Sequence, residues 1–227
     1  MFYLFLLAHL AADFMFQPSW LVARKQRWDG LLIHGAIVLV CMAVLPLFEA
    51  SVVALWPLIL GITVVHTLTD WWKVRYGSMV AGPPIVPFLL DQLIHIVTLV
   101  IGLGLVLPSD QVWSLAASPT ATLALCLAAY VVAAFATPIA VMIWLDPCAK
   151  EIAQAGKARL RSLFVGAGVV SLVLFGGALA LPATLLGAMV FVRRPRSTHP
   201  LDAPVGLMSV LVIGATMGVL LMQVLSL

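Results

Sequence analysis

Long apolar runs recur from one end of this chain to the other, and they constrain its fold more than any other feature. Each run approaches the roughly 20 residues that an α-helix needs to cross a bilayer. Only 9% of the 227 residues are charged, whereas a soluble domain carries about 25%. Such a chain cannot cover a water-facing surface with polar side chains. The sequence therefore predicts an all-α, polytopic transmembrane helical bundle.

The apolar runs divide the chain into about eight membrane segments. Residues 160–192 are short for two crossings with a turn near Pro182, so they could instead form a re-entrant pair. We expect one membrane domain over residues 1–227, with a His- and Asp-bearing four-helix half to residue 107 and an apolar helical half from residue 108. The predicted segments are 2–17, 30–48, 51–71, 86–107, 119–145, 160–179, 180–192 and 204–225.

The basic residues fall on one side of this arrangement. All twelve Lys and Arg follow an odd-numbered segment, and the positive-inside rule assigns that side to the cytoplasm. Both termini then face outward. Tryptophans near the segment ends agree, because Trp favours membrane interfaces. The small net charge of +3 therefore indicates orientation among membrane lipids, and we expect no nucleic-acid partner.

Three pairs of His and Asp share a spacing of four residues, and a further His lies on another segment. Residues four apart occupy one face of a helix, with Cβ atoms about 5–6 Å apart. In the predicted topology all seven lie at a similar depth, toward the cytoplasmic leaflet. An Asp at a helix centre costs roughly 2.5–3.5 kcal/mol to insert, so we favour one shared site over seven independent polar residues. The seven are His9 with Asp13, His34, His66 with Asp70, and Asp91 with His95.

Imidazole and carboxylate groups without thiolates suit a divalent metal such as Zn²⁺, Fe²⁺ or Mn²⁺. Zinc is the default, since its tetrahedral site can take ligands from several helices. Seven groups exceed what one zinc needs, so either two ions bind or some carboxylates orient ligands or act as a base. A metal-free proton relay is the alternative. We expect Asp13 to be the catalytic base and the metal ligands to be His9, His34, His66, Asp70, Asp91 and His95, with Gln17, Lys73 and Gln92 close by.

Four motifs follow one another within residues 5–100: HLAADFMFQ, LLIHG, HTLTDWWK and DQLIH. In this order they resemble the DUF3307 family of bacterial membrane proteins. The resemblance implies a multi-pass protein of the bacterial inner membrane. It implies no reaction, because the function of the family is unknown.

Our leading hypothesis from the sequence is a membrane-embedded, metal-dependent hydrolase that acts on a lipid or other amphiphile at the cytoplasmic leaflet. One alternative is a transporter of a divalent metal or of protons, although polar residues at a single depth count against a path across the bilayer. The other is a non-catalytic subunit or assembly factor with a structural His/Asp metal site. A catalytic site should keep an open position, whereas a structural zinc is closed by four protein ligands.

Overall fold

The computed structural model describes residues 1–115, 118–146, 156–177, 180, 182 and 199–225. Helices account for most of these residues, and none of those described forms a strand. Within them, six helical stretches are long and apolar enough to cross a membrane, and a shorter apolar stretch, Phe2–Met15, precedes them. The prediction of an all-α membrane bundle is confirmed. The six stretches are Trp28–Leu47, Ala50–Met79, Ile85–Val106, Pro119–Leu145, Gly156–Gly176 and Pro204–Leu225.

Seven of the eight predicted segments correspond to the six long stretches and to the shorter stretch Phe2–Met15. Most of the remaining segment, 180–192, lies outside the described residues. The clearest boundary difference is at the third segment, which was predicted to end at residue 71. Helix α4 (Trp56–Tyr76) continues for more than a turn and leads into the 3-10 helix η4 (Gly77–Met79). Hydropathy falls at Asp70, before the helix ends, so the hydropathy pattern alone stops too early. The extension places Lys73 on the same helix as Asp70.

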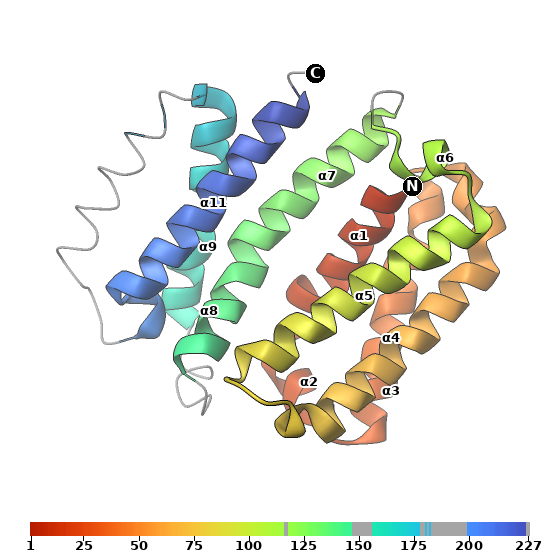
Figure 1. Ribbon diagram of the computed structural model, residues 1–227, viewed down its shortest axis with the longest axis horizontal. Helices are drawn as coiled ribbons and strands as arrows, with labels where there is room; N and C mark the ends of the chain where they lie inside the picture. Colours follow the sequence, from red (N-terminus) through yellow and green to blue (C-terminus); the bar gives the residue numbers. More distant parts are fainter. Residues whose placement is uncertain (116–117, 147–155, 178–179, 181, 183–198, 226–227) are drawn as a thin grey trace. The chain divides into compact units, whose positions relative to one another are not determined.

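The chain forms two compact units, Met1–Ala128 and Ala129–Leu227, and the single domain expected from the sequence stays a prediction. In the first unit α3 packs against α4, α4 against α5, and α1 against both α3 and α5 (Figure 1). Short 3-10 helices η2 and η3 connect α3 to α4. The elements of this unit are α1 (Phe2–Leu10), the π-helix η1 (Ala11–Met15), α2 (Ser19–Arg24), α3 (Trp28–Ala43), η2 (Leu45–Leu47), η3 (Ala50–Leu55), α4, η4, α5 (Ile85–Val106) and α6 (Ser109–Trp113).

The apolar core of the first unit lies around the start of α1 and α4 and the end of α3 and α5. Its fully buried side chains include Phe5, Met42, Ile59 and Leu103. The Met1 ammonium donates to the backbone carbonyls of Gln111 and Val112 at 3.0 and 3.3 Å, and partial burial lowers the pKa of this amine. We call this the Met1 end of the unit, and the opposite end, near Lys25 and Lys73, the lysine end.

The second unit is held together by close helix packing. Its elements are the end of α7 (Pro119–Val131), the π-helix η5 (Val132–Ala136), α8 (Thr137–Leu145), α9 (Gly156–Gly176), η8 (Pro200–Asp202) and α11 (Pro204–Leu225). A Cβ atom at Gly218 would lie 2.7 Å from the Cβ atom of Val173, so only glycine permits α11 to approach α9 this closely. No group of potential metal ligands occurs among the residues described here.

Candidate metal site

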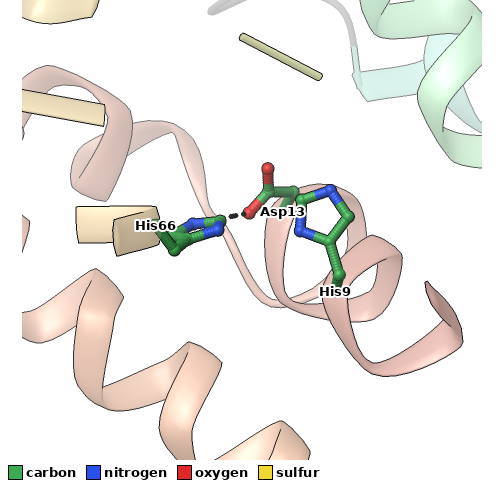
Figure 2. Close-up of side chains that lie close together, drawn as sticks. All are labelled: His9, Asp13 and His66. Atoms are coloured by element: carbon green, nitrogen blue, oxygen red, sulfur yellow. Dashed lines mark ion pairs between the residues drawn. The ribbon is translucent and has the colours of Figure 1, made fainter. Parts of the chain in front are cut away.

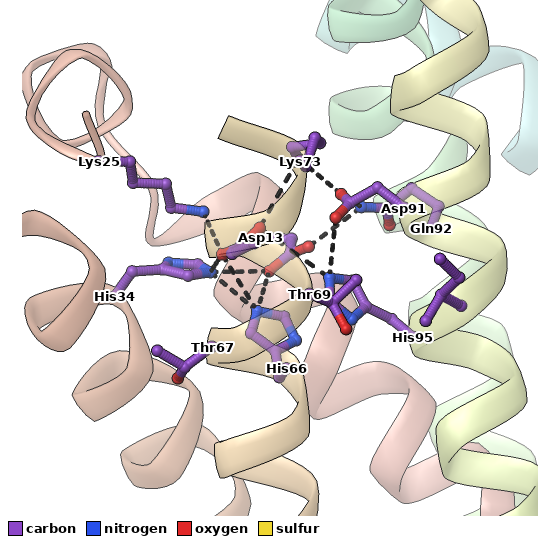
Figure 3. A network of polar contacts seen from close by, with 12 residues as sticks. Asp13, Lys25, His34, His66, Thr67, Thr69, Lys73, Asp91, Gln92 and His95 are labelled. Atoms are coloured by element: carbon purple, nitrogen blue, oxygen red, sulfur yellow. Dashed lines mark hydrogen bonds and ion pairs between the residues drawn. The ribbon is translucent and has the colours of Figure 1, made fainter. Parts of the chain in front are cut away.

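All seven polar residues singled out in the sequence converge at one buried place in the first unit. Figure 3 labels Asp13, His34, His66, Asp91 and His95 at this place. His66 lies at the centre of the imidazoles. Its ring centroid is 5.4 Å from that of His9, 5.1 Å from that of His34 and 3.9 Å from that of His95. The residues come from five elements: His9 from α1, Asp13 from η1, His34 from α3, His66 and Asp70 from α4, and Asp91 and His95 from α5.

The three His–Asp pairs are not equivalent. On α4 and α5 the i,i+4 partners lie 3.6 and 3.3 Å apart, as expected for one face of an α-helix. In the first pair, α1 widens into the π-helix η1 just after His9, and π-helical turns are frequent at functional sites. Asp13 there reaches His66 on another helix, and Figure 2 shows this ion pair beside the ring of His9. The π-helix thus directs Asp13 to the centre of the site.

Three atoms from three elements form a nearly equilateral triangle. Asp13 Oδ1 lies 3.1 Å from His34 Nε2 and 3.3 Å from His66 Nε2, and the two nitrogens are 3.0 Å apart. Two ligands of a tetrahedral zinc, with bonds of about 2.0–2.1 Å, are separated by about 3.3–3.4 Å. The edges of the triangle equal this spacing or are a few tenths of an ångström shorter, so a small outward shift of the atoms would let all three bind one ion.

One hydrogen bond cannot account for all the short contacts of His34 Nε2. His34 Nε2 faces Asp13 Oδ1, His66 Nε2 and also Asp70 Oδ2, at 3.1, 3.0 and 3.3 Å. A ring nitrogen carries at most one proton, which points in one direction. One proton therefore cannot satisfy all three contacts, whereas a cation between these atoms attracts every lone pair that faces it.

Lysines hold two of the three carboxylates. Lys25 donates to Asp70 Oδ2, and Lys73 donates to Asp91 Oδ2, each at 2.6 Å. Asp13 instead accepts a hydrogen bond from the Gln92 side chain at 3.1 Å. In the part of the chain that the structure describes, no lysine or arginine nitrogen lies within ion-pair distance of Asp13. Asp13 is thus the carboxylate of the site that lacks a lysine partner.

Lys25 was not recognised from the sequence as part of the site. The sequence predicts only that Lys25 lies on the cytoplasmic side after the first segment, whereas in the structure just 4% of its surface is exposed. Its ammonium also donates to Gln17 Oε1 at 3.0 Å. The available sequence signal is the apolar residue Leu21 four positions earlier, which predicts that Lys25 shares its helix face. The structure places Leu21 on the inward face of α2, fully buried. Lys73 and Gln92, which were expected nearby, do lie in the site.

The sequence profile of DUF3307, described as a protein of unknown function, matches residues 1–124 and so covers more than half of the chain. The chain belongs to the DUF3307 family. No curated protein and no solved structure matches it significantly. The DUF3307 match covers almost all of the unit that ends at Ala128, so every residue of the polar cluster lies inside the family region.

The buried cluster of this DUF3307 protein carries an unbalanced charge. Three ionised carboxylates against two ammonium groups leave one net negative charge if the histidines are neutral. Burying an uncompensated charge is costly. A single divalent cation would reverse the sign, leaving one positive charge for an anion to cancel. Two divalent ions would leave three, so the charge of the cluster favours one ion.

A small cavity borders the imidazoles of the DUF3307 site. It has a volume of about 10 Å³ and is lined in part by His9, His66, His95 and Thr98, which is about the space needed for one water molecule. His9 Nε2 is buried and has no hydrogen-bond partner among the described residues. A water in this cavity would lie beside a ring nitrogen that is available to bond it.

The side chains present fit a divalent ion in more than one combination. Besides the triangle of Asp13, His34 and His66, three other groups of ligand atoms lie close enough together to hold one: His9, Asp13 and His66; His34, His66 and Asp70; and Asp13, Asp91 and His95. All seven predicted residues belong to at least one of them. Their convergence is therefore a property of the fold, while the division into ligands and base stays a prediction.

Proposed function

We propose that this DUF3307 protein is a membrane-embedded, metal-dependent hydrolase that acts on a lipid or other amphiphile. The observation that carries the proposal is the triangle formed by Asp13 Oδ1, His34 Nε2 and His66 Nε2, with edges of 3.0 to 3.3 Å. Catalytic zinc sites typically use three protein ligands and leave the fourth position for water or substrate. The triangle supplies three such ligands, and zinc remains the first candidate ion.

The distances support a division of roles that differs from the one expected from the sequence. Asp13 becomes a ligand, because its carboxylate faces both imidazoles and has no lysine partner. Asp70 and Asp91 become orienting residues held by Lys25 and Lys73.

His9 and His95 have a different place in this proposal. Both border the small cavity, and His9 Nε2 is free to accept a proton from a water held there. A bound divalent ion would supply the remaining chemistry by lowering the pKa of that water toward neutrality. His9 is therefore our candidate for the proton acceptor, and His95, whose Nε2 atom is 3.3 Å from Asp91 Oδ1, lines the same cavity.

We further propose a multi-pass arrangement in the bacterial inner membrane, with the lysine end of the first unit in the cytoplasm and both termini outside. Arg24, Arg27 and Arg75, like the two lysines, lie at or beyond the helix ends on that side, in agreement with the positive-inside rule. A site within helices that cross the membrane favours a substrate that is itself amphiphilic. The substrate would reach the site from the cytoplasmic leaflet.

A closed structural site is the second candidate, and one observation favours it. The cluster is almost completely buried, with His34 and Asp91 fully inaccessible, and it ties α1, α3, α4 and α5 together. Transport receives less support, because the described side chains buried between the cluster and the Met1 end, such as Met42, Ile62 and Leu99, are apolar, and the cavity beside the imidazoles measures only about 10 Å³. Catalysis requires the lysine end to open, and a structural role does not.

Metal content and turnover of the purified full-length protein test these proposals together. We expect one zinc per chain, which Asp13→Asn, His34→Ala and His66→Ala remove. The matched control is Asp110→Asn, which changes an exposed carboxylate of the same unit and should keep the metal. Hydrolysis of membrane lipids by the zinc-loaded protein alone would establish the enzyme. A protein without metal contradicts the site, and a protein with metal but no turnover on any lipid class supports the structural alternative.

A further inference from the structure

An apolar surface groove runs along α3 beside the buried cluster. Its volume is about 570 Å³, and it lies within helices that are apolar enough to cross a membrane. Every side chain that lines it is apolar or a thiol. The lining consists of Phe16, which follows η1, and of Ile33, Ala36, Ile37, Val40 and Cys41 on α3.

The groove and the cluster share the two elements that supply Asp13 and His34. Phe16 follows Asp13 by three residues, and Ile33 and Ile37 flank His34 on α3. His34 is fully buried, whereas Ile33 is exposed. The same stretch of α3 therefore presents a ligand to the inside of the unit and apolar side chains to the groove.

The direction of the groove matches that of a lipid chain from one leaflet. Helix α3 starts at the lysine end, and the eight helical steps from Ile33 to Cys41 span about 12 Å at 1.5 Å per residue. Half of the hydrocarbon core is about 15 Å thick. A chain whose head group lies at the lysine end would run along this stretch toward the middle of the bilayer.

Charged side chains lie at the lysine end of the face of α3 that lines the groove. Asp29 precedes Ile33 by four residues, which places it one turn nearer that end. Arg24 donates to Asp29 at 2.6 Å, and Arg27 lies 3.3 Å from its other oxygen. Both arginine side chains are at least half exposed, so this group carries one net positive charge. Guanidinium groups bind phosphate with two parallel hydrogen bonds.

We infer that the groove binds one acyl chain of an anionic phospholipid from the leaflet at the lysine end, with its phosphate at Arg24 and Arg27. The apolar lining fits the chain, and the positive group at the mouth fits the head. As the mode of substrate binding, the inference rests on the proposed function. Occupancy of the groove itself requires no metal, so the lipid site and the proposed function can fail separately.

Photo-crosslinking of the full-length protein in phosphatidylcholine vesicles tests the inference. The probe is a phosphatidylglycerol with a diazirine in one acyl chain, and labelled residues are located by mass spectrometry. We expect Ile33, Ile37 and Cys41 to be labelled about tenfold more than the exposed face of α4 around Val64, which corresponds to a preference of about 1.4 kcal/mol. Equal labelling of the two faces would mean ordinary lipid solvation and would overturn the site.

Two substitutions make the test specific. Ala36→Phe fills the groove at an exposed position and should reduce its labelling to the level of α4, while the control Val64→Phe, also on the exposed surface, should leave it unchanged. Arg24→Gln combined with Arg27→Gln should abolish the preference for phosphatidylglycerol over a phosphatidylcholine probe.

The outcomes test the lipid site, the phosphate position and the proposed function separately. Labelling that survives Ala36→Phe, or a cross-link from the groove to a second protein chain in place of lipid, contradicts the lipid site. A preference for phosphatidylglycerol that survives the double Arg substitution contradicts the phosphate position. Asp13→Asn should remove the metal and leave labelling intact. Loss of labelling in this variant would contradict a groove that is occupied without metal, whereas retention of the metal would contradict the proposed function alone.

Discussion

At the scale of single residues, the buried Lys25 and the half-buried Lys73 decide what the three carboxylates can do. Lys25 and Lys73 neutralise Asp70 and Asp91 through contacts of 2.6 Å. Breaking a buried ion pair by removing one partner is much more costly than never having formed it, because the other charge stays buried and unpaired. The lysines therefore leave Asp13 as the carboxylate best able to bind a cation.

Replacing Lys25 with Met tests this division of charge. It leaves Asp70 buried and unpaired, so we expect the metal-free protein to lose about 3–5 kcal/mol of stability. Added zinc should restore part of the loss, because an ion that binds the folded state stabilises it. Unfolding in detergent micelles, with and without zinc, measures both effects. The control is Lys157→Met at an exposed position of the second unit, and an equal loss in the control would contradict the prediction.

His9 provides the second test at this scale. Its Nε2 atom is buried without a partner beside the small cavity. If it accepts a proton during turnover, His9→Gln should retain the metal and reduce the rate by about 10²–10⁴-fold, the usual contribution of a general base. Metal analysis and turnover on the same preparation distinguish this result from loss of a ligand, in which metal and activity would disappear together.

At the scale of elements, the site depends on how closely α3 and α4 approach one another. The ligands His34 and His66 come from these two helices, and the neighbouring contact is made by Gly35. A Cβ atom at Gly35 would lie 2.6 Å from Thr67 Oγ1, which itself donates to the carbonyl of Thr63. Glycine is therefore required there for packing, and its small size sets the distance between the two imidazoles.

Gly35→Ala should separate the two helices and weaken the site. Overpacking of this kind costs about 1–3 kcal/mol, and zinc affinity should fall because the nitrogens of His34 and His66 move apart. Gly61→Ala is the matched control, since its Cβ atom would meet no atom within 4 Å, and it should be neutral or slightly stabilising. Adding Thr67→Ala to Gly35→Ala should restore metal binding. Failure of that rescue, measured by zinc titration, would place the defect elsewhere.

At the scale of the whole molecule, the family region and the candidate site coincide. The DUF3307 match ends at residue 124, close to the boundary of the first unit at Ala128. All residues of the cluster, their lysine partners and the groove lie in this unit. The first unit therefore carries the chemistry that we propose, while the described helices of the second unit pack through small residues.

The orientation of the first unit in the membrane gives a prediction at the same scale. In a variant whose native cysteines are replaced by serine, a cysteine at Arg27 should react with a membrane-impermeant maleimide only after the cells are opened. A cysteine at Asp110, at the Met1 end, should react in intact spheroplasts. The expectation follows from the basic residues at the lysine end. The reverse pattern would place the site at the outer leaflet and contradict a cytoplasmic substrate route.

The sequence by itself determined the fold class and the seven His and Asp residues of the cluster. Apolar runs of bilayer length predict membrane helices because the backbone inside a membrane must satisfy its own hydrogen bonds. The i,i+4 spacing of His66 with Asp70 and of Asp91 with His95 predicts a shared helix face, because helix geometry is local. Both features can be read over short stretches of chain, so neither requires knowledge of how the helices pack.

Only the tertiary structure decided how the members of the cluster are paired. Lys25 and Asp70 are 45 residues apart, and Gln92 and Asp13 are 79 apart, so no local pattern shows that they meet. Hydropathy treats Arg24 and Lys25 alike, although one is exposed and the other buried. The π-helical turn at Asp13 and the groove along α3 likewise depend on packing between helices. Composition and spacing identify the chemical groups of the site. Contacts between distant parts of the chain determine which carboxylate is paired with a lysine and how far apart the site atoms lie.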